Sequence, residues 1–139
     1  MKFAKINNEL TVSDQITIED LKEIHAQGYK TIFCNRPDHE SDGQLDFSSI
    51  EKEAQNLGIK AIHQPVIGGQ ISDDDITQFG SYFEEAQKPV FAYCRTGTRC
   101  STLWALSHAN TLPIDDILRK TQNAGYDLSL LRDRLNALK

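Results

Sequence analysis

The 139-residue sequence lacks long hydrophobic runs. None of its apolar stretches approaches the roughly 18 residues that a membrane-spanning helix needs. Residues 1–5 lead into the polar segment 7–9 rather than into the apolar core of an export signal. These two absences predict a cytoplasmic protein with no membrane partner.

A surplus of basic residues is also missing. The chain has 15 Lys and Arg against 20 Asp and Glu, which gives a net charge of −5 at pH 7 and a pI near 5.3. A general nucleic-acid binder needs charge of the opposite sign, so no nucleic-acid partner is expected. Any anion that the protein binds must therefore be held by a local arrangement of groups.

Cysteine and histidine are sparse and are not spaced as metal ligands. The three cysteines are an odd number without a C-x-x-C pair, which fits reduced thiols better than a disulfide framework. The four histidines form no H-x-x-x-H pattern; they are His25, His39, His63 and His108. We expect no metal and no other cofactor, and a cysteine is free to be chemically active.

Helical patterns alternate with short β-branched or aromatic runs, and there is no repeat, low-complexity stretch or linker. Helices are predicted from Thr17 to Gly28, from Phe47 to Gly58, from Ser72 to just before Pro89, and at 100–110, 114–124 and 128–138. Strands are predicted at 29–35, 59–66 and 89–93, with an edge strand or hairpin at 3–12. This order predicts a single α/β domain over residues 1–139, with a mostly parallel sheet of about four to five strands and helices on both faces.

Ligands of such sheets bind beyond the carboxyl ends of the strands. The sequence places Arg36, residues 67–72 and residues 94–99 at that edge.

Residues 90–104 carry the strongest functional signal, because they predict a buried strand, a tight turn and the start of a helix. Cys94 is the first residue of the turn, whose backbone N–H groups and positive helix end form a cradle for an anion. A thiol with an ordinary pKa near 8.5 is only about 3% ionised at pH 7, so a nucleophilic Cys94 needs inward N–H groups or a guanidinium. The candidate phosphate-binding residues are Arg95, Thr96, Gly97, Thr98 and Arg99. The less specific interpretation is a buried Cys94 between two solvated arginines.

This loop resembles two kinds of enzyme. Protein tyrosine and dual-specificity phosphatases usually have five residues between Cys and Arg, whereas rhodanese sulfurtransferases have four, as here. The Asp-x-Arg and Gly-His-Ile motifs of rhodaneses are absent. The order and spacing of the other motifs resemble the bacterial beta-lactamase-hydrolase-like phosphatase family, a nonclassical relative of the dual-specificity phosphatases. These motifs lie at residues 15–21, 28–32, 35–40, 64–66 and 94–99.

The resemblance implies a protein-tyrosine-phosphatase-like fold and a cysteine-dependent phosphomonoester hydrolase that needs no metal. Its substrate would be a phosphorylated protein or a small phosphoester. Cys94 would attack phosphorus and form a cysteinyl-phosphate that water then hydrolyses. Arg99 and the amides of the loop would stabilise the equatorial oxygens.

Three positions depart from the family pattern. Tyr93 replaces the usual His before the nucleophile, which predicts a less stabilised thiolate. Cys100 replaces the Ser or Thr that helps the sulfur to leave, and Ser101 is the candidate substitute. Gly68 lies where the general acid, an Asp, is usually found.

Asp73, Asp74 and Asp75 follow Gly68 in the same connection and are the candidate general acids, on a flap that could move. Acidic residues after a Ser72 cap are also what a helix N-terminus prefers, and we favour this interpretation. Weak general acid catalysis would favour aryl phosphates as substrates, because a phenolic leaving group needs less protonation than an alkoxide.

Two residues of the preceding connection are further candidates. Cys34 could form a reversible disulfide with Cys94 under oxidation, although a core thiol is the favoured interpretation. Arg36 could orient the loop or contact substrate, or make an exposed ion pair with Asp38 or Glu40.

Two other functions fit parts of the sequence. A rhodanese-type sulfurtransferase would carry a persulfide on Cys94, in agreement with the four-residue spacing. A non-catalytic phosphate-binding module would explain why the acid is missing from its usual place. No pattern specifies a physiological substrate or an oligomer.

Overall fold

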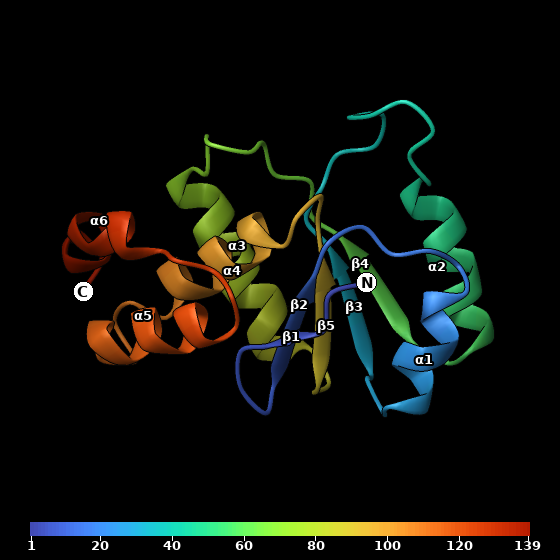
Figure 1. Cartoon of the computed structure of the whole chain (residues 1–139), viewed down its shortest axis with the longest axis horizontal. Helices are drawn as coiled ribbons and strands as arrows, with labels where there is room; N and C mark the ends of the chain where they lie inside the picture. Colours follow the sequence, from blue (N-terminus) through green and yellow to red (C-terminus); the bar gives the residue numbers. More distant parts are fainter.

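The computed structural model describes residues 1–139 and contains a five-stranded sheet with the order β1-β2-β5-β3-β4 (Figure 1). The strands are β1 (Ala4–Lys5), β2 (Leu10–Ser13), β3 (Thr31–Cys34), β4 (Lys60–His63) and β5 (Val90–Tyr93). Only β1 runs antiparallel to its neighbour. The predicted α/β class with a mostly parallel sheet is confirmed.

The first predicted strand forms a hairpin, but its second half does not lie at the edge of the sheet. β2 pairs parallel to β5, with Val12 opposite Ala92, and only the short β1 is an edge strand. The buried apolar residues Leu10 and Val12 explain this position, because a strand inside the sheet is covered on both faces.

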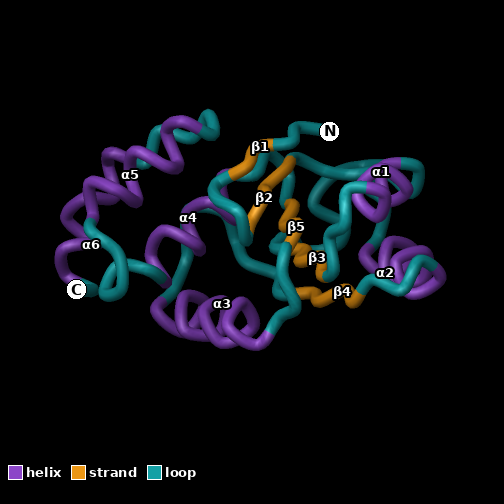
Figure 2. The backbone as a smooth tube through the Cα atoms, turned by 90° about the horizontal axis from the view of Figure 1, so that it is seen from below, coloured by secondary structure: helices purple, strands orange, loops and turns teal.

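The chain forms six α-helices: α1 (Asp20–Ala26), α2 (Phe47–Asn56), α3 (Asp73–Glu85), α4 (Thr98–Ser107), α5 (Ile114–Asn123) and α6 (Arg132–Ala137). α1 and α2 cover one face of the sheet and α3 and α4 the other, while α5 and α6 pack on the outer side of α4 (Figure 2). Helices on both faces were predicted and are confirmed. The predicted helix at 128–138 is divided into a 3-10 turn at Ser129–Leu131 and the short α6.

α1 begins three residues later than predicted. Thr17 does make the expected reciprocal hydrogen bonds with Asp20, but the residues between them form only a turn. By contrast, α3 begins where predicted, because Ser72 and Asp75 form a complete capping box.

The alternation of side chains along β3 and β5 separates two hydrophobic clusters. Phe33, Ala92 and Cys94 pack toward α3 and α4, whereas Cys34 and Tyr93 pack toward α1 and α2. This follows from the two-residue period of a strand. The cysteine after β5 and the cysteine at the end of β3 therefore face opposite sides of the sheet.

The four parallel strands end at one edge, where the loops after β2, β3, β4 and β5 meet (Figure 1). Arg36, residues 67–72 and residues 94–97 belong to these loops, and residues 98 and 99 begin α4 at the same edge. None of the helices combines the length and apolar character needed to cross a membrane.

Candidate active site

The loop from β5 to α4 is anchored at both ends. The Cys94 N–H donates to the Ser13 carbonyl at 3.2 Å, which continues the pairing of β2 with β5 for one more residue. Gly97 has φ +93°, a left-handed conformation that favours glycine, and it is the N-cap of α4. The loop therefore curls back over the Cys94 side chain.

The curled loop directs hydrogen-bond donors at the Cys94 sulfur. The Gly97 N–H donates to Sγ at 3.0 Å. A hydrogen bond from the Cys100 thiol lowers the pKa of Cys94 most, and the N–H groups of Cys100, Thr96 and Gly97 add to it, so the pKa falls to about 5 although burial opposes the charge. A pKa near 5 favours the thiolate form of Cys94 at neutral pH, although Tyr93 stands in place of the usual His.

The two residues after Arg99, Cys100 and Ser101, differ in what their side chains contact. Burial raises the pKa of Cys100 well above its usual value, so its thiol keeps a proton to share with Cys94. The Ser101 hydroxyl donates to the Gly97 carbonyl at 2.9 Å and is directed at the backbone. This geometry favours Cys100 over the predicted Ser101 as the side chain that stabilises the sulfur.

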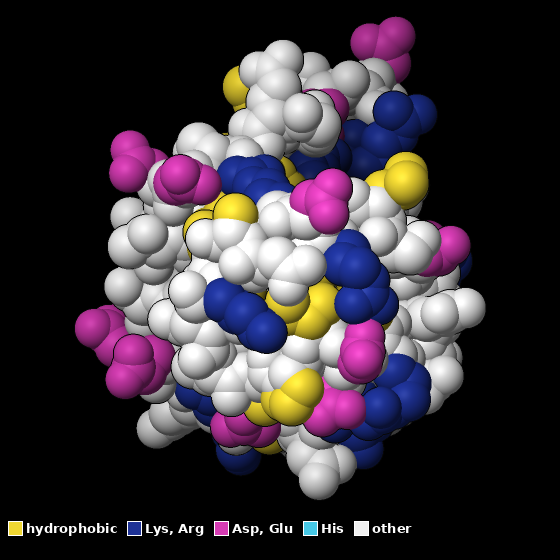
Figure 3. Space-filling view, turned by 90° about the vertical axis from the view of Figure 1, so that its left-hand side faces the viewer, with side chains coloured by type: hydrophobic (Ala, Val, Ile, Leu, Met, Phe, Trp, Pro, Cys, Tyr) yellow, Lys and Arg dark blue, Asp and Glu magenta, His cyan; other side chains and the backbone are white.

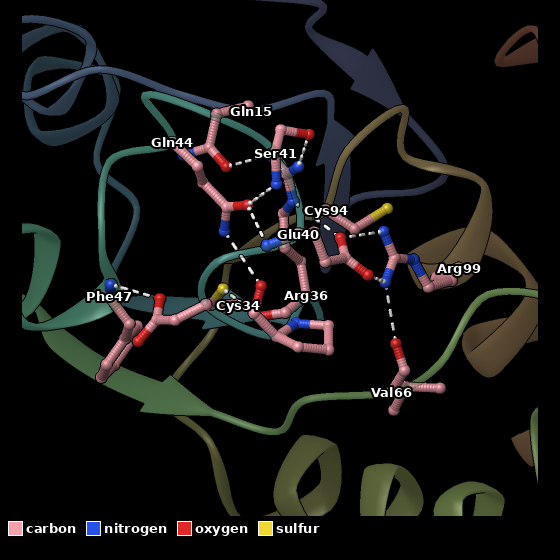
Figure 4. A network of polar contacts seen from close by, with 12 residues as sticks. Gln15, Cys34, Arg36, Glu40, Ser41, Gln44, Phe47, Val66, Cys94 and Arg99 are labelled. Carbon is pink, nitrogen blue, oxygen red and sulfur yellow. Dashed lines mark hydrogen bonds and ion pairs between the residues drawn. The ribbon is translucent and has the colours of Figure 1, made fainter.

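Arg99 is held by a residue that the sequence analysis did not assign to the site. Its Nη1 and Nη2 donate to the two carboxylate oxygens of Glu40 at 2.8 and 2.9 Å, and Nη1 also donates to the Val66 carbonyl at 2.8 Å (Figure 4). These bonds use three of the five guanidinium N–H groups. The Nε–H and one Nη2–H remain, and they form the side-on fork of the guanidinium.

The side-on fork is the part of Arg99 that these contacts leave free for a ligand. The Glu40 carboxylate chiefly, with the negative charge of Cys94, raises the pKa of Arg99, so the guanidinium stays charged. Its free edge can hold two oxygens of a tetrahedral anion.

Glu40 is fixed in turn by Arg36, which is only 3% exposed. Arg36 donates from Nε to Glu40 at 2.9 Å, from Nη1 to Gln15 at 2.8 Å and from Nη2 to Ser41 at 3.0 Å (Figure 4). Of the two predicted partners, Glu40 is the one observed, but the pair is buried on the arginine side rather than exposed. Asp38 instead accepts the Phe47 N–H at the start of α2.

The two ion pairs keep Glu40 ionised. The Arg99 hydrogen bond chiefly, with that of Arg36, lowers the pKa of Glu40 to about 2. The sequence offered no signal for this role, because Glu40 is one of several polar residues in a loop without periodicity.

The three candidate acids are placed at the N-terminus of α3. Asp75 completes the capping box with Ser72, and Asp73 accepts a 3.3 Å hydrogen bond from Arg134. Asp74 is exposed. None of the three lines the pocket beside the loop, so the structure supports the favoured interpretation of a helix terminus.

A pocket of about 420 Å³ opens beside the loop. Its walls include the guanidinium-bearing Arg95, Arg99 and Arg134 and the apolar Ile71 and Leu131, and no carboxylate lines it. The neighbouring face with α5 and α6 mixes both charge signs and has no broad basic patch (Figure 3). Attraction for an anion is therefore local to the loop and the pocket.

Cys34 packs on the other face of the sheet from the nucleophile. It packs with the α1 and α2 cluster, its thiol donates to the Arg36 carbonyl at 3.4 Å, and burial raises its pKa to about 11. This supports a core thiol and does not support pairing with Cys94. No group of three or more His, Cys, Asp or Glu side chains is arranged to hold a metal.

A thiolate in a curled loop, at the carboxyl edge of a parallel sheet and beside an arginine, is the arrangement of protein-tyrosine-phosphatase-like proteins. Solved structures agree with this fold. Tk-PTP is 15% identical with a TM-score of 0.77, covering 99% of this chain and 95% of that one. The catalytic core of the PP-IP phosphatase Siw14 from S. cerevisiae is 16% identical with a TM-score of 0.74, covering 98% and 84%.

Residues 2–111 match the family described as beta-lactamase hydrolase-like protein, phosphatase-like domain. The chain belongs to this family, as its motifs predicted. The beta-lactamase hydrolase-like protein of Agrobacterium fabrum is 37% identical over 92% of this chain, and this chain spans 30% of that protein. A solved Neisseria meningitidis protein, described as a candidate phosphatase, is 40% identical with a TM-score of 0.89, covering 100% of this chain and 99% of that one.

Proposed function

We propose that residues 1–139 form one domain that hydrolyses phosphomonoesters through Cys94. The observation that carries this proposal is that the Gly97 N–H donates to Cys94 Sγ at 3.0 Å while Arg99 lines the adjoining pocket. Hydrogen bonds, that of the Cys100 thiol foremost, lower the pKa of Cys94 to about 5. A nucleophile and donors for a tetrahedral oxyanion are thereby combined at one point. Membership in a phosphatase-like family supports phosphate over sulfur as the transferred group.

The reaction has two steps. The Cys94 thiolate forms a bond to phosphorus while the bond from phosphorus to the leaving oxygen breaks, and this oxygen takes up a proton from the solvent. Water then attacks phosphorus and gives up a proton to the solvent, the sulfur leaves as a thiolate and inorganic phosphate is released. Arg99 and the loop N–H groups stabilise the oxygens in both steps, and the Cys100 thiol stabilises the departing sulfur.

Access to the sulfur requires movement, because Cys94 has no exposed surface. Arg99 lines the pocket, and Glu40 accepts hydrogen bonds from its Nη1 and Nη2. The entering phosphate binds at the side-on fork, while Glu40 retains the other edge of the guanidinium. Glu40 and Arg36 thus keep Arg99 oriented as the phosphate enters.

Aryl phosphates are the favoured substrates. No carboxylate lines the pocket, so the leaving oxygen must depart with little help from a general acid. A phenolic oxygen can leave in this way, whereas the alkoxide of an alkyl phosphate cannot. Ile71 and Leu131 offer apolar contact to a ring, and Arg95 offers a guanidinium on which a ring can stack. A phosphotyrosyl protein or a small aryl phosphate fits these walls.

The proposal is tested by assaying an aryl phosphate, an alkyl phosphate, and thiosulfate with cyanide, using Cys94→Ser as control. We expect hydrolysis of the aryl phosphate, slower hydrolysis of the alkyl phosphate, and loss of both in the variant. Sulfur transfer would instead support a rhodanese activity. Phosphate binding without turnover would support a non-catalytic module.

A further inference from the structure

Tyr126 contacts the nucleophile loop from outside the segment that matches the family. The match ends at residue 111, whereas Tyr126 follows α5. Gly125 has φ +102° and turns the chain at the end of α5, and the Tyr126 N–H bonds back to the Thr121 carbonyl at 2.9 Å. The ring is thereby directed at the loop, where it is only 6% exposed.

The Tyr126 hydroxyl donates to the Thr96 carbonyl at 2.9 Å. The ring also packs directly on the next residue, because a Cβ on Gly97 would lie 2.1 Å from the Tyr126 Oη. This contact explains why a side chain at position 97 would not fit, in addition to the left-handed backbone there. Tyr126 thus touches both residues of one peptide unit.

That peptide unit is the one that reaches the nucleophile. It is trans and planar, so its C=O and its N–H point in opposite directions. When the Thr96 carbonyl is held by Tyr126, the Gly97 N–H must point to the other side, where Cys94 Sγ lies at 3.0 Å. A rotation of this peptide would break both hydrogen bonds together.

We propose that Tyr126 is a positioning residue for the nucleophile, which locks the Thr96–Gly97 peptide so that the Gly97 N–H faces first the thiolate and then the phosphate. This inference rests on the proposed function of Cys94. It assigns Tyr126, in the segment after α5, a role in orienting the nucleophile loop.

The hydroxyl is suited to this task because it stays protonated. Burial chiefly, with the negative charges of Cys94 and Asp14 adding to it, raises the pKa of Tyr126 to about 12. Lys2 is the cation that faces the ring, 5.6 Å from its centroid. At neutral pH Tyr126 is therefore a hydrogen-bond donor.

The test compares Tyr126→Phe with Tyr29→Phe in the full chain. Tyr29 is a matched control because it is also a buried tyrosine. Its hydroxyl hydrogen-bonds the Thr11 hydroxyl, and its ring lies in the hydrophobic cluster on the opposite face of the sheet. The readout is the pH titration of thiolate ultraviolet absorbance, with Cys94→Ser subtracted. We expect the pKa of Cys94 to rise by about one unit in Tyr126→Phe, a tenfold change in its ionisation constant, and to stay unchanged in Tyr29→Phe.

Equal pKa values in Tyr126→Phe and the wild type, or equal shifts in both variants, would overturn the inference. Either variant is expected to melt at a lower temperature, and this loss of stability by itself does not shift the pKa of Cys94. The titration needs no turnover, so it separates failure of this inference from failure of the proposed phosphatase activity. If the enzyme is active, the acid limb of its pH–rate profile should shift with the thiolate pKa.

Discussion

At the scale of single residues, the chemistry depends on how the neighbours of Cys94 differ from the family pattern. The customary His is a Tyr that faces the other side of the sheet, yet the pKa of Cys94 is lowered to about 5. The Cys100 thiol makes the largest contribution, and its own raised pKa keeps it a donor. We therefore propose that Cys100 takes over the task that the family pattern gives to a hydroxyl.

Replacing Cys100 tests this assignment. In Cys100→Ala we expect the pKa of Cys94 to rise by about one to two units, because a hydrogen bond to a charged group is lost. In Cys100→Ser a donor is retained, and the pKa should stay near the wild-type value. Thiolate absorbance against pH measures both. Identical titrations of the Ala and Ser variants would show that the side chain of residue 100 does not stabilise the thiolate.

At the scale of elements, the N-terminus of α3 shows how one acidic triplet can serve structure rather than catalysis. The Asp75 carboxylate accepts the Ser72 N–H at 3.0 Å, and the Ser72 hydroxyl accepts the Asp75 N–H at 3.1 Å. These bonds satisfy N–H groups that the helix itself leaves free. Asp73 and Asp74 add favourable charge at the same end.

We therefore expect Asp75→Ala to lower the free energy of unfolding by about 1 kcal/mol, the usual cost of losing a cap. Asp74→Ala is the control, since Asp74 is exposed, and should change stability little. Urea unfolding measures both effects. Neither variant should remove the basic limb of the pH–rate profile on an aryl phosphate, and loss of that limb in either one would make it the general acid.

At the scale of the whole molecule, one chain of contacts joins the loops after β2, β3 and β4 to the first turn of α4. It runs from Gln15 through Arg36 and Glu40 to Arg99 and ends at Val66 (Figure 4). Tyr126, from the segment after α5, adds a hydrogen bond to the Thr96 carbonyl. The nucleophile loop is thus supported by segments from both halves of the chain.

This network predicts a specific acid sensitivity. Because the folded pKa of Glu40 is about 2, below its usual 4.5, Glu40 stabilises the fold fully above pH 4.5 and loses that effect as the pH falls toward 2. Glu40→Gln should therefore be less stable than the wild type at pH 7, and the difference should shrink at pH 3. Urea unfolding at the two pH values tests this. Glu84→Gln, a change at an exposed residue of α3, should show no such pattern, and a constant difference for Glu40→Gln would contradict the account.

The sequence was sufficient to predict the helices, the strands and the segment from Cys94 to Arg99, because these depend on local patterns. Hydrophobic periods, glycine stops and the Ser72 cap predicted the helices, and Cys94, Gly97 and Arg99 lie within one turn. Glu40 and Tyr126 could not be found in this way. Each reaches the loop across a long stretch of chain, and its contact depends on how an irregular segment folds.

The central claim is that the Cys94 sulfur becomes phosphorylated during turnover. The direct measurement mixes the full chain with an aryl phosphate, quenches the reaction in acid within the first turnovers and analyses the peptides by mass spectrometry. The account predicts one phosphoryl group on the peptide that contains Cys94, and none in Cys94→Ser. Release of phosphate with that peptide unmodified at every time, or a phosphoryl group on another residue, would contradict it.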